Sequence, residues 1–204
     1  MPVSLSAAGL SKSFGNLKVF SGLDFSLATG EVLIVTGPNG SGKSTLLKIL
    51  SGLLTPSSGQ VEYRNENNVI RKGERREFLW MVSPDLSFYE ELSAFENLEF
   101  FLSLLGRPKT KMTQALARVG LNGRENEEVS SFSLGMRQRL KYALAILLEP
   151  KFLFLDEPTA NLDESGRKLV NELLCEQKTR GLAVVATNDP QEYAWGDKKL
   201  ELGC

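Results

Sequence analysis

The sequence has 204 residues, of which 42% are hydrophobic and 24% charged, values typical of a globular chain with one main core. Its formal net charge of −1 excludes a global basic field that would recruit nucleic acid. Because the sequence contains no histidine, histidine cannot serve as a general base or metal ligand. No apolar run is long enough to span a bilayer and no secretory signal pattern is present, so we expect a cytoplasmic chain. The two cysteines, Cys175 and Cys204, have neither disulfide nor metal-site spacing.

The first part of the chain favours short strands separated by turn signals. Strands are predicted over Val3–Leu10, Lys18–Leu27, Glu31–Thr36 and Gly59–Tyr63. Leucine and isoleucine at helical spacing predict one helix in this part, over Ser44–Leu53. The third strand, the loop after it and this helix therefore follow one another directly.

The loop between that strand and helix, Gly37–Thr45, reads GPNGSGKST and fits the phosphate-binding template of Gly, four residues, Gly, Lys and Ser or Thr. Glycines allow backbone turns in which successive N–H groups point at an anion. Lys43 can bring a positive charge to phosphate oxygens, and the Ser44 hydroxyl can ligate Mg²⁺. A glycine-rich turn that only caps a helix is the alternative, but the flanking elements favour triphosphate binding. The predicted nucleotide-binding residues are Gly37, Pro38, Asn39, Gly40, Ser41, Gly42, Lys43, Ser44 and Thr45.

The pattern changes to helices from about residue 84 to residue 150. Apolar residues at three- and four-residue spacing predict helices over Ala94–Leu105, Thr110–Leu121 and Leu134–Leu148. An all-helical subdomain over about 84–150 is therefore predicted as an insertion.

The last part of the chain alternates strands with a helix. Strands are predicted over Phe152–Asp156, Leu182–Thr187 and Lys198–Leu202, with a helix over Glu164–Arg180. This alternation is typical of a parallel sheet, which places the chain in the α/β class.

Two acids, Asp156 and Glu157, follow the four apolar residues FLFL, at the edge where ligands bind in open α/β sheets. Beside a phosphate loop, Asp156 can orient a Mg²⁺ shell and Glu157 can polarise a water for attack on the γ-phosphate. Alone, the same pair would fit an ordinary strand-to-loop turn.

These two motifs and the segment FSLGMRQRL between them, Phe132–Leu140, resemble the ATP-binding subunits of ABC transporters. The match to the family's Leu-Ser-Gly-Gly-Gln signature is the variant Phe-Ser-Leu-Gly-Met, residues 132–136, and the resemblance covers essentially the whole chain. It implies a P-loop NTPase-type core with a mixed sheet, an N-terminal antiparallel β part and the inserted helical subdomain. Residues 1–204 would form a single ATP-binding domain.

The resemblance also implies roles for residues outside the phosphate loop. Ser133 and Gly135 of the signature would face the nucleotide of a second subunit, so that a homodimer or heterodimer encloses two ATP molecules. Phe14 stands where the family stacks an aromatic ring on adenine, although a core phenylalanine is the alternative from the residues alone. Asp163, in ANLD, would belong to the loop through which the subunits communicate.

Two positions depart from the family pattern. Pro84, with Ser83 as the neighbouring option, occupies the position of a glutamine that senses Mg²⁺ and the attacking water, and proline has no polar side-chain group. Asn188 occupies the position of a histidine, and an amide can donate to a γ-phosphate oxygen but carries no charge. We therefore expect ATP binding with slow hydrolysis, in which Glu157 acts on the attacking water and Lys43 and Asn188 act on the reacting phosphate.

The leading function is an Mg-ATP-hydrolysing subunit that drives transport through a separate transmembrane permease, on the cytoplasmic face of the membrane. The main alternative is a regulatory ABC subunit that binds ATP with little or no hydrolysis, because Pro84 and Asn188 replace the usual residues. A soluble ABC ATPase acting on ribosomes or DNA is disfavoured by the lack of a second cassette and of a basic surface signal. The chain's size and the segment ELSAFENLEFF, Glu91–Phe101, resemble compact export-type subunits, including the haem-exporter group.

Overall fold

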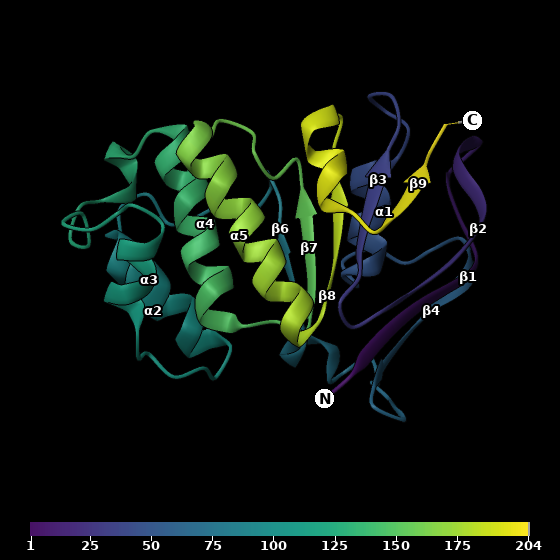
Figure 1. Cartoon of the computed structure of the whole chain (residues 1–204), viewed down its shortest axis with the longest axis horizontal. Helices are drawn as coiled ribbons and strands as arrows, with labels where there is room; N and C mark the ends of the chain where they lie inside the picture. Colours follow the sequence, from purple (N-terminus) through teal and green to yellow (C-terminus); the bar gives the residue numbers. More distant parts are fainter. Residues whose placement is uncertain (204) are drawn as a thin grey trace. The chain divides into compact units, whose positions relative to one another are not determined.

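The computed structural model describes residues 1–203, and these fall into two compact units (Figure 1). The first unit comprises residues 1–81, 150–158 and those from 174 onward. The second comprises residues 82–149 and 159–173. Of the two cysteines, Cys175 is exposed and Cys204 lies outside the described residues.

The first unit contains an antiparallel four-stranded sheet in the order β2-β1-β4-β5. Its strands are β1 (Val3–Phe14), β2 (Leu17–Ala28), β4 (Ser58–Asn65) and β5 (Asn68–Val69). Strand β1 runs four residues beyond the predicted end at Leu10. Its pairing with β2 shifts register three times between Ala7 and Ser13 before it reaches the pair Phe14 and Leu17. Such bulges interrupt the alternation of side chains on which the sequence prediction relied.

The same unit carries a five-stranded sheet in the order β6-β7-β8-β3-β9. The strands are β6 (Leu79–Val82), β7 (Phe152–Asp156), β8 (Leu182–Ala186), β3 (Val32–Thr36) and β9 (Lys198–Glu201). The pairs β7–β8, β8–β3 and β3–β9 are parallel. Every residue of β3, β7 and β8 is buried, as expected for continuous apolar runs at the centre of a parallel sheet.

The register of the three central strands brings their carboxyl ends to one edge of this sheet. Ala186 of β8 pairs with Val35 of β3 on one side and with Asp156 of β7 on the other. The loops that follow β3, β7 and β8 therefore start next to one another, which is where open α/β sheets bind ligands.

Helix α1 (Lys43–Leu50) follows β3 and packs against β7 and β8. The sequence predicted its end at Leu53, but the chain leaves the helix at Ser51 and turns at Gly52, whose φ is +80°. Helix α5 (Glu164–Arg180) begins in the second unit and ends in the first. Its buried Gln177 donates to the carbonyls of Pro150, Lys151 and Leu182, next to β7 and β8. The 3₁₀ helices η1 (Arg75–Glu77) and η3 (Pro190–Trp195) complete the helices of this unit.

The second unit is built on α2 (Ala94–Leu104), α3 (Met112–Arg118) and α4 (Leu134–Leu148), which pack against one another in pairs (Figure 1). A short 3₁₀ helix, η2 (Val129–Ser131), precedes α4. Helix α2 starts at a capping box in which Ser93 Oγ accepts from Glu96 N and the Glu96 carboxylate accepts from Ser93 N. Helix α3 is shorter than predicted because Lys111 before it and Gly120 after it adopt positive φ.

The predicted fold class is confirmed, since an antiparallel N-terminal sheet, a sheet of parallel strands and a helical insertion are all present. The sequence assigned about 84–150 to the helical subdomain, whereas the compact unit starts at residue 82 and also takes in residues 159–173. Within residues 1–203, none of the helices has the length and apolarity needed to cross a membrane.

Candidate nucleotide-binding site

The loop Gly37–Thr45 leaves the carboxyl end of β3 and ends in the first turn of α1. Gly37, Gly40 and Gly42 have φ values of +141°, +81° and +99°, a backbone region that residues other than glycine rarely adopt. A Cβ atom on Gly37 would lie 2.3 Å from the Leu202 carbonyl oxygen, and one on Gly42 would lie 2.4 Å from Val19 Cγ1. Because the loop cannot hold this shape with larger residues at those two positions, the glycines of the sequence motif are required by the backbone.

Lys43 folds back over this loop. Its Nζ donates to the carbonyls of Gly37 at 2.8 Å and Pro38 at 3.2 Å, and the residue is 7% exposed. Within the loop, the hydroxyl of Ser41 is buried and has no hydrogen-bond partner among residues 1–203. Buried polar groups are normally paired, so this hydroxyl is an exception within the loop.

Ser44 and Asp156 meet at the carboxyl edge of the parallel sheet. Ser44 Oγ donates to Asp156 Oδ1 over 3.1 Å, and Asp156 is 4% exposed. The contact joins the first turn of α1 to the last residue of β7. Oxygen atoms of hydroxyl and carboxylate groups are the ligands that Mg²⁺ prefers, so this pair fits the metal predicted from the sequence.

Glu157 follows Asp156 in a left-handed conformation, with φ of +48°. Its N–H donates to the Ala186 carbonyl at 2.9 Å, which aligns it with the end of β8. Burial raises the pKa of its carboxyl group above the usual value, while the nearby Lys43 ammonium opposes the rise. A carboxyl group whose pKa is raised in this way is suited to accept a proton near neutral pH.

Asn188 lies in the loop after β8 and reaches the phosphate loop directly. Its Nδ2 donates to Asn39 Oδ1 at 2.6 Å. The backbone N–H of Thr187 donates to the Val35 carbonyl at 3.0 Å, which holds the start of this loop beside the end of β3. The structure thus brings Asn188 to the site that its sequence position predicted.

Phe14 is the last residue of β1 and is 51% exposed. The ammonium group of Lys12 lies 4.7 Å from the centre of its ring and also donates to the Thr55 carbonyl at 2.8 Å. An exposed ring is incompatible with the alternative of a core phenylalanine. Lys12 was not singled out from the sequence, because its place over the ring depends on the pairing of strands.

The remaining predicted residues lie in the second unit. Ser133 is the N-cap of α4, where its hydroxyl accepts from Met136 N at 3.2 Å. A Cβ atom on Gly135 would lie 2.8 Å from the Asn161 carbonyl oxygen. Glycine at this position therefore lets the Asn161 backbone pack closely against the start of α4.

Asp163 lies in the same unit and directly precedes α5. Its carboxylate accepts from Gly166 N at 2.9 Å, from Ser165 Oγ at 3.0 Å and from the Arg139 guanidinium at 2.6 Å. The hydrogen bond from Gly166 N, together with that from Ser165, holds the pKa of Asp163 below its usual value. Arg139 comes from α4, so the predicted signature and the Asp163 loop form one connected block.

Ser83 and Pro84, for which the family resemblance implies a glutamine position, directly follow β6. The ammonium group of Lys141, from α4, donates to the Ser83 carbonyl at 2.8 Å and lies 3.4 Å from that of Pro84. Burial lowers the pKa of Lys141, with Asp85 opposing the change. This contact could not be predicted from the sequence, because a lysine in an amphipathic helix normally points to solvent.

In this structure a glycine-rich loop connects a strand of a parallel sheet to a helix, and an acid pair lies at the end of a neighbouring strand. These features define a P-loop nucleotide-binding protein. Residues 20–160 match the family model described as ABC transporter. The chain belongs to this family, as one of its ATP-binding proteins.

Curated relatives match most of the chain. The lantibiotic transport ATP-binding protein SrtF of Streptococcus pyogenes is 32% identical over 186 residues, which cover 90% of this chain and 79% of that protein. The cytochrome c biogenesis ATP-binding export protein CcmA of Xanthomonas oryzae pv. oryzae is 38% identical over 187 residues, covering 91% and 86%.

Solved structures agree with these relatives. A dimeric, post-hydrolysis state of the ATP-binding cassette MJ0796 bound to ADP and Pi aligns with a TM-score of 0.84 at 25% identity, covering 97% of this chain and 94% of that chain. The protein cbiO1 of Clostridium perfringens, part of the ABC transporter complex cbiONQ, aligns with a TM-score of 0.78 at 30% identity, covering 97% and 84%.

Removal of the Lys43 ammonium group tests the phosphate loop. We expect Lys43→Ala to weaken Mg-ATP binding at least tenfold, because a charged hydrogen bond to an anion contributes about 1.5–3 kcal/mol. Isothermal titration calorimetry measures the effect, with Lys168→Ala on the exposed side of α5 as control. Equal affinities of the two variants would contradict the assignment.

Proposed function

We propose that this chain binds and hydrolyses Mg-ATP and that hydrolysis drives transport through a separate transmembrane permease subunit. The observation that carries the proposal is the contact between Ser44 Oγ and Asp156 Oδ1, beside a phosphate loop covered by Lys43. It brings oxygen ligands for a metal next to groups suited to a polyphosphate.

In this proposal the backbone N–H groups of residues 37–45 bind the phosphates, and Lys43 exchanges its contacts with the loop carbonyls for phosphate oxygens. Ser44 and Asp156 would hold Mg²⁺, which supplies Lewis-acid stabilisation of phosphate charge when bound. Phe14, exposed at the end of β1, offers its ring to adenine.

Glu157 is the proposed base for the attacking water. Its raised pKa keeps the carboxylate basic enough to accept a proton, and the Asn188 backbone N–H donates to it. Its neighbours Lys43 and Asp156 influence the same titration, which is expected of a group at the centre of the site.

Hydrolysis should be slow because two groups that usually assist it are replaced. Pro84 offers no polar side-chain atom, and the Ser83 and Pro84 carbonyls interact with Lys141. Asn188 can donate a hydrogen bond but cannot carry the positive charge available to histidine, so it stabilises less of the developing negative charge. If both replacements abolished turnover, the chain would act as a regulatory ATP-binding subunit.

The functional assembly proposed here is a dimer, either of two copies or of this chain and a similar subunit. Ser133 and Gly135, at the start of α4, would meet the nucleotide of the opposite subunit, and Asp163 would lie in the communicating loop. The dimeric solved cassette with ADP and Pi supports this arrangement by similarity. In this scheme residues 1–204 act as a single ATP-binding domain, with residues of about 84–150 as the helical subdomain that carries the signature.

The membrane partner and location are proposed from the same family membership. The subunit would sit on the cytoplasmic face, beneath the permease, with no role in nucleic acid binding. CcmA is named as an export protein and SrtF as a lantibiotic transport protein, which favours an export-type group for this chain.

The Glu157→Gln variant tests the proposed base. Glutamine keeps the size of the side chain but cannot accept the proton, so phosphate release should fall by at least about 100-fold while Mg-ATP-dependent dimerisation persists. A phosphate-release assay and analytical ultracentrifugation measure the two properties. Glu172→Gln, on the exposed surface of α5, is the control, and an unchanged rate in Glu157→Gln would refute the assignment.

Replacing Asn188 by histidine tests the explanation for slow turnover. We expect Asn188→His to raise kcat on the order of tenfold, because an imidazole can donate to the γ-phosphate and carry a positive charge. Steady-state phosphate release measures kcat, with Asn171→His on α5 as the matched control. A kcat equal to or below that of the natural sequence would count against this explanation.

A further inference from the structure

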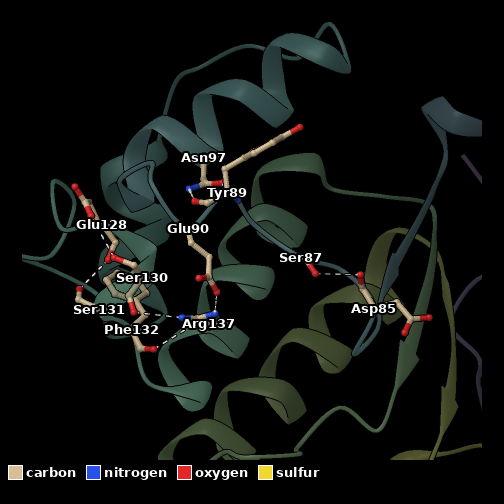
Figure 2. Close-up of polar contacts among 10 residues, drawn as sticks. All are labelled: Asp85, Ser87, Tyr89, Glu90, Asn97, Glu128, Ser130, Ser131, Phe132 and Arg137. Carbon is tan, nitrogen blue, oxygen red and sulfur yellow. Dashed lines mark hydrogen bonds and ion pairs between the residues drawn. The ribbon is translucent and has the colours of Figure 1, made fainter.

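Arg137, in the first turn of α4, connects three parts of the helical unit (Figure 2). Its Nε donates to the Phe132 carbonyl at 3.2 Å, and its Nη2 donates to the Ser130 carbonyl at 3.3 Å. Its Nη1 forms an ion pair with Glu90. One guanidinium therefore binds both the backbone that leads into α4 and a side chain 47 positions earlier in the chain.

Glu90 lies on a turn whose residues before and after it are held by hydrogen bonds to Asn97. Asn97 of α2, which is fully buried, accepts from Tyr89 N at 2.9 Å, and its Nδ2 donates to the carbonyls of Tyr89, Leu92 and Ser93. Figure 2 shows Asn97 against Tyr89, with the Glu90 carboxylate directed away from them and toward Arg137. A rigid turn of this kind gives the Glu90 carboxylate a defined position.

The backbone of the same turn pairs with the segment before α4. Ser130 N donates to the Glu90 carbonyl at 2.9 Å, and Val129 N donates to the Leu92 carbonyl at 3.0 Å. Glu90 thus contacts this segment through its backbone and, by way of Arg137, through its side chain. The arrangement holds residues 129–132 against the turn.

The Phe132 carbonyl belongs to the peptide immediately before Ser133, the N-cap of α4. Phe132 itself is buried at 4% exposure. The hydrogen bond from Arg137 Nε therefore fixes the orientation of the peptide that presents Ser133 and the first N–H groups of α4.

We propose that Arg137 is a positioning residue for the Ser133–Gly135 element, and that Glu90 holds Arg137 in place. The inference rests on the proposed function, in which this element meets ATP bound to a second subunit. The arrangement of Arg137, Glu90 and the carbonyls of Ser130 and Phe132 is termed the signature clamp.

The exposure of the Arg137 and Glu90 side chains indicates that the signature clamp sets the position of the Ser133–Gly135 element more than it stabilises the fold. The side chains of Arg137 and Glu90 are 31% and 55% exposed, and ion pairs this open to water add little to folding free energy. A small displacement of groups that must meet a phosphate, in contrast, has a large effect on binding and turnover. The clamp should therefore influence closure of the dimer while leaving the fold and the phosphate loop unchanged.

A double-mutant cycle tests the clamp through ATP-dependent dimerisation of the Glu157→Gln chain, which is expected to dimerise without turnover. Arg137→Ala should raise the ATP concentration for half-maximal dimerisation on the order of tenfold, and Glu90→Ala should raise it by less. The double variant should match Arg137→Ala, because Glu90 acts only through Arg137. Glu90→Gln, which keeps an acceptor, should lie between Glu90→Ala and the unaltered chain.

Two further measurements separate positioning from a structural role. Melting temperature and the Mg-ATP affinity of the monomer should stay within error of the unaltered chain, since the phosphate loop lies in the first unit. Arg137→Lys should behave like Arg137→Ala, because lysine keeps the charge but lacks the planar fork that reaches three acceptors. The control pair is Glu99→Ala and Lys109→Ala, another exposed ion pair of the helical unit, which should have no effect.

The outcomes are distinguishable. If the Glu157→Gln chain does not dimerise with Mg-ATP at all, the proposed function fails and this inference fails with it. If it dimerises and the clamp variants do so equally well, or if the effects of Glu90→Ala and Arg137→Ala multiply, only the inference is overturned. A melting temperature lowered in step with dimerisation would also overturn it, because the role would then be structural.

Discussion

The contact between Ser44 and Asp156 is the constraint on which the nucleotide site depends. The two residues are 112 positions apart in the chain, and their side chains meet at 3.1 Å. The parallel register of β3, β8 and β7 makes this possible, because Ala186 pairs with both Val35 and Asp156. The buried apolar runs that form these strands therefore set the distance between the phosphate loop and the acid pair.

The second unit has its own internal order around α4. The start of this helix packs on the Asn161 backbone through Gly135, and Arg139 joins it to Asp163. Arg137 joins the segment before it to Glu90, and Lys141 joins its middle to the Ser83 carbonyl. One helix thus organises the signature, the Asp163 loop and the turn after β6.

The sequence predicted those elements whose pattern is continuous and local. Helix Leu134–Leu148 and strand Phe152–Asp156 were predicted with the observed bounds, because apolar periodicity and flanking turns are unambiguous there. Strand β1 was predicted too short because its bulges break the alternation before Phe14. The sequence also predicted that the phosphate loop and Asp156 lie together, since each follows a buried strand at the edge where open α/β sheets bind ligands.

Side-chain pairings between distant segments could not be predicted. Nothing in the pattern around Glu90 or Arg137 points to the partner of either residue, because charged residues in loops and first turns usually face solvent. The same is true of Lys141 and Lys12, whose contacts depend on how helices and strands pack.

The most direct test of the account is the Mg²⁺ dependence of ATP binding in a cycle of Ser44→Ala, Asp156→Asn and the double variant, measured by calorimetry with and without EDTA. The account predicts that each single variant loses most of the Mg²⁺-dependent part of the affinity and that the double variant loses little more, because both oxygens serve one ion. Retention of the full Mg²⁺ dependence in both single variants would contradict it.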